Sequence, residues 1–372
     1  MTLAATQSAL VVLPCKDLAA TLAWFVEQLG FRLERIAPAD DPARALISGF
    51  GLQIELLRGD TDDGSVLRLL CEDPVGKYEA LQGGVGLGAG TRSVSAPNGT
   101  RVDLCEASPP LQVPRLKTEL VHTSGADAHW VTGRAGMGYR DLIPGRLGGR
   151  FIASQIRIVE AGPVPDSVHF HQIRIQLIYC VAGWVRVAYE DQGDDLVMEA
   201  GDCVLQPPGI RHRVLESSAD LQVIEVGCPA EHDTWLDHEL ALPTGQLRPQ
   251  RDFGGQRFVH HVAASAPWSP WRGEGFEQQC TAIAAATDGL ARVCSVRCLD
   301  EQAVAPLEHD GELLFFSILN GAVSWHCEGR DPLRLEQGDS LVVPAGLSSE
   351  LLCGTSNLRM LEVWLPEMAS PS

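Results

Sequence analysis

The residues with the clearest chemistry lie within positions 165–216. His169 and His171 are separated by one residue, and Gln176 follows five positions later. Because side chains two residues apart on a β-strand point to the same face, these two histidines can bind one ion together. His212, expected on a later strand, could complete a face of three imidazoles. Neutral imidazoles suit Fe, Zn, Cu or Ni and leave positions open for a substrate or O₂. The pattern therefore predicts a metal site.

The elements that must position these residues are short strands. From residue 150 onward, strand-like runs separated by Gly, Pro and Asp follow one another at even spacing, which predicts an antiparallel barrel or jelly roll. The order then recurs with a displacement of 137 residues, which relates Gly201, Pro207, Gly209 and Glu225 to Gly338, Pro344, Gly346 and Glu362. A repeat of this length predicts two barrels in tandem, because the units of a solenoid are far shorter.

Two stretches resemble the sequence motifs of the cupin family. The first is His169-x-His171-x4-Gln176-x6-Gly183, with Gln where Glu is usual, and the second is Gly201-x5-Pro207-x-Gly209-x2-His212. The resemblance implies a bicupin, in which residues 140–235 form a metal-binding barrel, 236–275 a connector and 276–368 a second barrel. In that family the two His and the Glu of the first motif, with the His of the second, bind a divalent metal inside the barrel.

Carried over to this chain, the resemblance implies His169, His171 and His212 as metal ligands. Gln176 would be a weak fourth ligand or a donor that orients a bound group, because a neutral carboxamide binds hard cations less well than a carboxylate. Arg174 is a candidate for pairing with a substrate carboxylate. Gln176 and Arg174 are thus the candidate catalytic residues. The cofactor would be one divalent ion, with Fe(II) favoured and Zn, Ni, Mn, Co or Cu as alternatives.

The second copy of the motif lacks these ligands. His309-Asp310-Gly311 replaces the paired histidines, Leu314 takes the place of Gln176, and Ser349 aligns with His212. One remaining histidine cannot hold an ion by itself. We therefore expect the second barrel to be free of metal and to serve packing.

The N-terminal part has a different pattern. A strand-like run at 9–13, a helix that begins at Asp17 and three further strand-like runs give a βαβββ order, which resembles the glyoxalase and bleomycin-resistance (vicinal oxygen chelate) module over residues 1–108. Residues 96–104 are similar to the closing hairpin of that module. The first strand carries no ligand, and Glu55 and Asp103 are expected on solvated strand faces. We expect a scaffold, a dimerisation surface or a lid, followed by a linker over 109–139.

Composition limits the partners. The chain has 372 residues, with 29 basic against 48 acidic side chains and a net charge of −19, a field that repels nucleic acid. Eleven cysteines without a CxxC pair favour reduced thiols. No apolar run reaches about 18 residues, the length needed to cross a membrane. These features predict a cytoplasmic protein that acts on a small molecule without nucleic acid or membrane partners. Apolar sheet surfaces are compatible with a homodimer.

The fold class expected is therefore mainly β, with two cupin-type jelly-roll barrels in tandem and an N-terminal α+β (βαβββ) module. The function expected is a metal-dependent oxidoreductase, with an Fe(II) dioxygenase acting on a small organic acid, phenol or diketone as the first hypothesis. A Zn- or Ni-dependent isomerase or lyase and a non-enzymatic protein that binds a metal or small ligand are the alternatives. Both module types host many chemistries, so the substrate does not follow from the fold.

Overall fold

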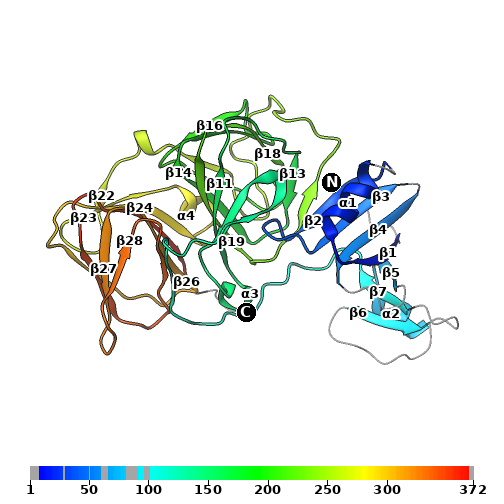
Figure 1. The fold of residues 1–372 in the computed structure, drawn as a ribbon, viewed down its shortest axis with the longest axis horizontal. Helices are drawn as coiled ribbons and strands as arrows, with labels where there is room; N and C mark the ends of the chain where they lie inside the picture. The colour runs from blue at the N-terminus through cyan, green and yellow to red at the C-terminus, as the bar shows by residue number, and fades with distance from the viewer. Residues whose placement is uncertain are drawn as a thin grey trace. The chain divides into compact units, whose positions relative to one another are not determined.

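The computed structural model describes residues 8–27, 30–49, 51–59, 66–80, 91–95 and 101–367. The chain divides into two compact units, one formed by 1–112 together with 232–237 and the other by 113–231 together with 238–372. Strands predominate and the helices are short, so the predicted mainly β fold is confirmed (Figure 1). No helix in the described ranges has the length and hydropathy to cross a bilayer.

The first unit is a mixed sheet that carries α1 (Leu18–Glu27) and α2 (Pro74–Ala80). Its strands, in the order in which they pair, are β20 (Thr234–Leu236), β2 (Arg32–Ala37), β3 (Arg44–Gly49), β4 (Leu52–Arg58), β1 (Ser8–Cys15), β5 (Val66–Cys71), β7 (Arg101–Glu106) and β6 (Thr91–Ser95). The chain order β1-α1-β2-β3-β4 confirms the predicted βαβββ order. Asp17 caps α1 as expected, because its Oδ1 accepts the N–H of Ala20 at 2.9 Å. Residues 96–100 of the predicted hairpin lie outside the described residues.

Residues 232–237 belong to the first unit, although residues up to 235 were predicted to complete the first barrel. β20 pairs with β2 in antiparallel register, with Arg35 opposite Trp235. An ion pair of 2.8 Å between Arg35 and Asp233 holds the same segment. The free edge of β2 thus gains a partner from a distant part of the chain, a pairing that strand patterns within one segment do not reveal.

Glu55 and Asp103 are buried, so the expectation of solvated carboxylates was wrong. Glu55 pairs with Arg35 at 3.2 Å and with Arg68. Asp103 accepts hydrogen bonds from Arg101 and from the hydroxyl of Ser93. Arginines therefore neutralise both carboxylates, and the described residues of this unit contain no cluster suited to a metal.

The first barrel of the second unit consists of two sheets. One sheet runs β21 (Val259–His261), β17 (Cys203–Leu205), β14 (Ile175–Ala182), β19 (Leu221–Cys228), β11 (Ile152–Ile158), β10 (Gly138–Asp141), β9 (Val131–Thr132). The other runs β16 (Leu196–Glu199), β15 (Trp184–Tyr189), β18 (His212–Ser217), β13 (His169–His171), with β12 (Gly162–Pro163) also on β18. The 3₁₀ turn η1 (Arg134–Gly136) precedes β10, and the short α3 (Arg146–Gly149) follows it.

The second barrel also consists of two sheets, with a similar order of strands (Figure 1). One sheet runs β22 (Ser269–Pro270), β23 (Phe276–Cys280), β24 (Arg292–Cys298), β31 (Arg359–Leu365), β26 (Leu313–Asn320), β29 (Ser340–Val342), β8 (Val121–Thr123). The other runs β25 (Val304–Leu307), β30 (Ser349–Cys353), β27 (Ala322–His326), β28 (Leu333–Glu336). In the chain, η2 (Ala263–Ser265) lies between the two barrels, whereas α4 (Ile283–Ala286) lies between β23 and β24 of the second barrel. The predicted linker 109–139 therefore contributes β8 to the second barrel and β9 to the first.

Alternation along β14 shows how the two barrels meet. Ile178 and Cys180 pack in the interior of the first barrel, whereas Leu177 and Tyr179 belong to a core shared with strands of the second barrel. The hydroxyl of Tyr179 lies 3.0 Å from Ser295 Oγ on β24. One face of β14 thus lines the first barrel, and the other is buried against the second.

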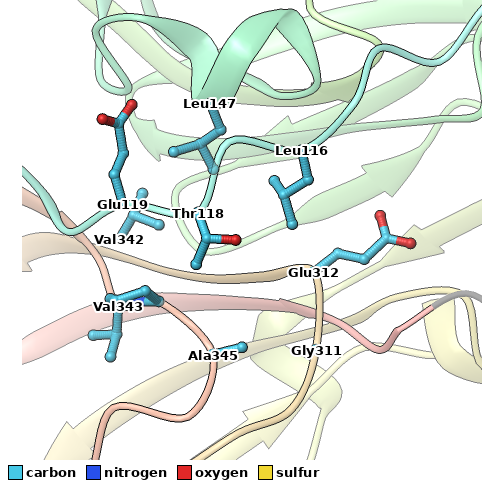
Figure 2. Close-up of a pocket in the computed structure, with 10 residues that line it drawn as sticks. Leu116, Thr118, Glu119, Leu147, Gly311, Glu312, Val342, Val343 and Ala345 are labelled. Carbon is cyan, nitrogen blue, oxygen red and sulfur yellow. The ribbon is translucent and has the colours of Figure 1, made fainter.

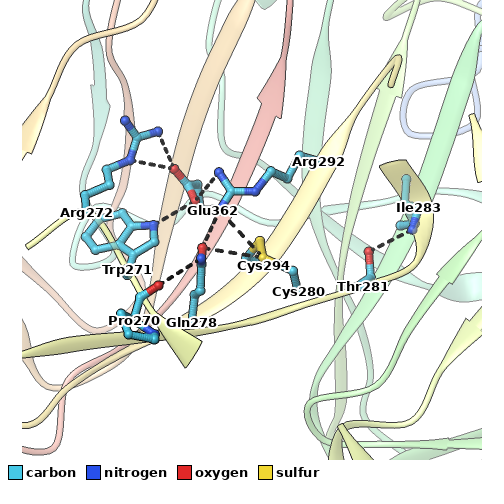
Figure 3. The surroundings of a disulfide bond; sticks show 10 residues. All are labelled: Pro270, Trp271, Arg272, Gln278, Cys280, Thr281, Ile283, Arg292, Cys294 and Glu362. Carbon is cyan, nitrogen blue, oxygen red and sulfur yellow. Dashed lines mark hydrogen bonds and ion pairs between the residues drawn. A yellow bond between two sulfur atoms is a disulfide. The ribbon is translucent and has the colours of Figure 1, made fainter. Parts of the chain in front are cut away.

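Four cysteines form two disulfides, so the expectation that all thiols are reduced was wrong for these positions. Cys280 and Cys294 stand directly opposite one another on β23 and β24, with Cα atoms 4.0 Å apart (Figure 3). Cys298 and Cys353 join the two sheets of the second barrel. The other seven cysteines, all within the described ranges, are not disulfide-bonded. These disulfides join cysteines 14 and 55 residues apart, so they can be predicted only once the pairing of the strands is known.

Candidate metal centre

The three predicted ligands come together in the interior of the first barrel. His169 and His171 lie on β13, where alternation places both rings on one face. His212 begins β18 and stands opposite His169 in antiparallel register. The possible ligand nitrogens of all three lie within 4.8 Å of one another, and each residue is at most 6% exposed. This is the one cluster of its kind among the residues that the structure describes.

Hydrogen bonds fix the ligand nitrogen of two of these rings. His169 Nδ1 lies 2.7 Å from the carbonyl oxygen of Ser167, and His212 Nδ1 lies 3.0 Å from that of Ile210. Because a carbonyl oxygen can only accept, each Nδ1 carries the proton and each Nε2 carries the lone pair. Metal-binding histidines commonly make this contact, which orients the ring and sets its tautomer.

Burial keeps these rings neutral. It lowers the pKa of His212 from 6.5 to about 4. Burial also lowers the pKa of His169 well below its ordinary value, and the positive charge of Arg134 adds to that effect. At neutral pH both imidazoles are therefore in the form that donates a lone pair to an ion.

The donor set fits a divalent ion with a small contraction. Two nitrogens bound to one ion at roughly 2.1 Å lie at most about 4.2 Å apart, and the three possible ligand nitrogens lie within 4.8 Å of one another. The rings are close enough for that movement, because the centroids of His169 and His212 are 4.2 Å apart. The structure therefore contains a three-histidine site suited to a metal, as the sequence predicted.

Arg134 is a neighbour of this site that the sequence did not reveal. Its Nη2 lies 3.0 Å from His169 Nε2, and its Nη1 forms an ion pair with Asp166. The Asp166 side chain is fully buried and also accepts the N–H groups of Ser167 and Val214. The guanidinium thus occupies the lone pair that His169 would give to an ion. An ion can use His169 only if Arg134 turns away from it.

Gln176 forms a pair with Glu225 on the neighbouring strand β19. The amide Nε2 of Gln176 donates to Glu225 Oε1 at 2.5 Å. Leu221 and Val223 on the same strand pack in the barrel interior, so alternation places Glu225 there as well. Glu225 also raises the pKa of Arg134, which puts its carboxylate within electrostatic range of the guanidinium. A ligand role for Gln176 stays a prediction.

Arg174 binds the second barrel. Its Nη1 lies 2.8 Å from Glu312 Oε2, and Arg150 Nη2 lies 2.7 Å from the same oxygen. Glu312 also borders a small pocket together with Leu116 and Thr118 (Figure 2). Arg174 thus forms an ion pair between the two barrels. A role for Arg174 in substrate binding stays a prediction.

The interior of the second barrel is filled. Leu314 and Trp325, both at most 1% exposed, pack in its core. Glu362, which the repeat relates to Glu225, accepts hydrogen bonds from Trp271 Nε1 and Arg272 (Figure 3). His309 Nε2 lies 2.8 Å from the carbonyl oxygen of Val343. Among the described residues of this barrel, no group of three His, Cys, Asp or Glu side chains lies close enough together to hold one ion.

Comparisons with known proteins agree with the fold of the first barrel. Residues 156–227 match the family model of the cupin domain, and this range includes all three histidines and Gln176. Among solved structures, the chain is similar to Bacillus subtilis oxalate decarboxylase, with 14% identity and a TM-score of 0.48 over 70% of this chain and 80% of that one. Lactobacillus farciminis oxalate decarboxylase in complex with formate gives 14% identity and a TM-score of 0.49 over 70% and 89%. The search of curated proteins found no match.

Proposed function

We propose that this protein is a metal-dependent oxidoreductase that acts on a small, oxygen-rich organic substrate, and that it is an Fe(II) dioxygenase. The observation that carries the proposal is the convergence of three buried imidazoles from β13 and β18 inside one barrel. Neutral nitrogen ligands leave an ion most of its positive charge and several open positions. When bound there, Fe(II) would supply the one-electron chemistry that O₂ requires.

Arg134 offers the site a hydrogen-bond donor for an anionic substrate. A guanidinium beside the three rings can donate to a carboxylate or enolate oxygen of the substrate, and its Nε is buried without a partner in the barrel. The ion pair with Asp166 holds the guanidinium near the site. In this proposal Arg134 exchanges its contact with His169 for one with the substrate, so that substrate binding and release of His169 Nε2 occur together.

Gln176 and Glu225 supply the proton-handling group. Glu225 is a carboxylate inside the barrel, and Gln176 fixes the direction of one of its oxygens. A carboxylate in this position can take a proton from a hydroxyl group or an activated C–H of a substrate held on Arg134. The same pair supports a second candidate function, a Zn- or Ni-dependent isomerase or lyase, because proton transfer by Glu225 requires no redox-active metal.

Metal analysis and O₂ uptake test the proposal. Protein purified without a histidine tag should contain one divalent ion per chain, and the His169→Ala/His212→Ala protein should contain none. His309→Ala, which changes a buried histidine of the second barrel, is the matched control and should keep the ion. With Fe(II), the wild-type protein should consume O₂ only when a substrate from a panel of small organic acids, phenols and diketones is added.

The outcomes separate the candidates. Turnover with zinc or nickel and without O₂ uptake would replace the dioxygenase by the isomerase or lyase. Full metal content in the double variant would show that the three histidines are not the ligands. Tight binding of a metal and a small ligand without turnover would point to a binding protein.

A further inference from the structure

A second cavity lies between the two barrels, away from the three histidines. Its volume is about 300 Å³, and its walls come from β10, β11, β14 and β19 of the first barrel and from β26 of the second. Trp130 and Gly338 also border it. A cavity of this size is at the lower end of the range for small-molecule sites.

The notable group in this cavity is the guanidinium of Arg140, which is 4% exposed. Nη1 donates to Gln155 Oε1 at 3.0 Å, and Nη2 donates to the carbonyl oxygen of Ser124 at 2.9 Å. Nε is buried and has no partner. Both acceptors are neutral, and no carboxylate of the described residues forms an ion pair with Arg140. Two of its five N–H groups are thus satisfied, and its charge is left without a bonded counter-ion.

Asp339 of the second barrel attracts the charge of Arg140 electrostatically, but it forms no ion pair with the guanidinium. Its two oxygens accept the N–H groups of Gly125 at 2.7 Å and Glu336 at 2.9 Å. Asp339 raises the pKa of Arg140, but burial outweighs it and lowers that pKa overall. A buried charge without a bonded partner is costly, so an anion that bonds to this guanidinium would be strongly favoured.

The rest of the cavity adds a polar donor and an apolar wall. Gln155 Nε2 donates to Gln222 Oε1 at 2.8 Å, which leaves the amide N–H groups of Gln222 for another acceptor. Apolar side chains complete the lining, among them Ile224 and Trp130. Arg157 stacks on the Trp130 ring, with 4.2 Å from its guanidinium carbon to the ring centroid. A ligand here meets cationic and amide donors together with a hydrophobic surface.

We propose that this inter-barrel cavity binds a small carboxylate that carries an apolar group. The carboxylate would accept from Arg140 and Gln222, and the apolar group would pack against Ile224 and Trp130. The site is distinct from the metal centre, because alternation along β10 places Tyr139 in the interior of the first barrel and Arg140 on the opposite face. The proposal is therefore independent of the function proposed for the three histidines.

Calorimetric titration of the full chain tests the proposal, with chelator present so that no metal can bind the probe. Benzoate and isobutyrate are the probes, and benzamide is the uncharged control of matched shape. We expect one site per chain for at least one carboxylate, and benzamide should bind at least about ten-fold more weakly, since charge-assisted bonds are stronger than neutral ones. Arg140→Gln should weaken carboxylate binding by at least about ten-fold.

Two control variants locate the site. Arg334→Gln removes an exposed arginine that pairs with Glu336, and His212→Ala removes a metal ligand, so both should keep wild-type affinity. Absence of saturable binding by both probes, unchanged affinity in Arg140→Gln, or loss of binding in His212→Ala would overturn the proposal. If Arg140→Gln does not fold, Gln222→Leu takes its place, and unchanged affinity in that variant would overturn the proposal.

Discussion

Nη2 of Arg134 lies 3.0 Å from Nε2 of His169, so the guanidinium occupies the lone pair that His169 would give to an ion. The proton on Nδ1 of His169 leaves Nε2 as the only nitrogen of that ring that can bind an ion. Arg134 and a metal therefore compete for it. The same guanidinium forms an ion pair with the buried carboxylate of Asp166.

The first prediction is that Arg134→Met raises metal affinity. The substitution frees His169 Nε2 and removes a positive charge beside the ion. The dissociation constant for Zn²⁺ should fall by about ten-fold or more, which corresponds to about 1.4 kcal/mol. Because Asp166 is fully buried and loses its ion-pair partner, the free energy of unfolding should fall by about 3–5 kcal/mol, although two backbone N–H donors remain. Competition with a chromophoric chelator measures the affinity.

Arg186→Met is the matched control for this prediction. Arg186 lies on β15 of the same barrel and pairs with Asp195 and Glu216 at a half-exposed position. Its loss should leave metal affinity unchanged. Equal or weaker affinity in Arg134→Met would show that the guanidinium does not compete with the ion.

The cluster of three histidines was predictable because the positions of its members follow from local rules. Two-residue periodicity puts His169 and His171 on one face of a strand, and only the pairing with β18 was needed to bring His212 opposite. The two-barrel fold was likewise predictable from evenly spaced strands and the 137-residue repeat. Gly183 and Gly321, which each follow a barrel strand, both have φ near +75°, a backbone conformation that favours glycine.

The neighbours of the site were not predictable in the same way. Arg134 precedes His169 by 35 residues and reaches it from a turn in which Ala135 has φ of 55°, a placement that no periodic pattern indicates. Glu225 did carry a signal, because the repeat relates it to Glu362. Its pairing with Gln176 depends on the register of β14 and β19, which brings two strands separated by a long connection side by side.

The second prediction concerns the pair formed by Gln176 and Glu225. Gln176→Glu restores the carboxylate usual in the cupin motif but places it 2.5 Å from a second one. The two would share a proton, because like charges at this distance cannot both ionise. The free energy of unfolding of the metal-free variant should be about 2–4 kcal/mol lower than that of the wild type at neutral pH. Part of this difference should be recovered as the pH is lowered. Urea unfolding with chelator present measures the change.

The exchanged pair is the control for this prediction. Gln176→Glu/Glu225→Gln again holds one amide and one carboxylate, so its stability should return to within about 1 kcal/mol of the wild type. A single variant as stable as the wild type would mean that the two side chains separate in solution. A double variant as unstable as the single one would show that the loss of stability does not come from repulsion between the two carboxylates.

The third prediction separates backbone strain from collision at two turn glycines. Gly183 has φ of 76°, and a Cβ there would collide with Ser218 Oγ. Gly289 has φ of 81°, and a Cβ added there would meet no atom within 4 Å. Gly289→Ala should therefore cost about 1–2 kcal/mol from conformation alone, and Gly183→Ala should cost more. Equal losses in urea unfolding would show that Ser218 moves away at no cost.

The fourth prediction concerns the ion pairs that join the barrels. Arg174 and Arg150 hold the pKa of Glu312 below its ordinary value of 4.5, against the opposing effect of burial. The unfolded chain therefore binds a proton more readily than the folded one. The stabilisation is fully present above pH 4.5 and is lost as the pH falls through the lower pKa of the folded protein. Glu312→Gln removes this dependence and leaves two arginines without their carboxylate.

Glu312→Gln should cost about 2–4 kcal/mol at neutral pH, because both arginine partners are mostly buried. The difference from the wild type should shrink when unfolding is measured at about pH 3, where the wild-type carboxylate approaches protonation. Glu277→Gln, which breaks a more exposed pair with Arg297 on the second barrel, should cost about 1 kcal/mol or less. A Glu312→Gln difference that stays constant between the two pH values would show that the loss arises from packing and not from the charge of Glu312.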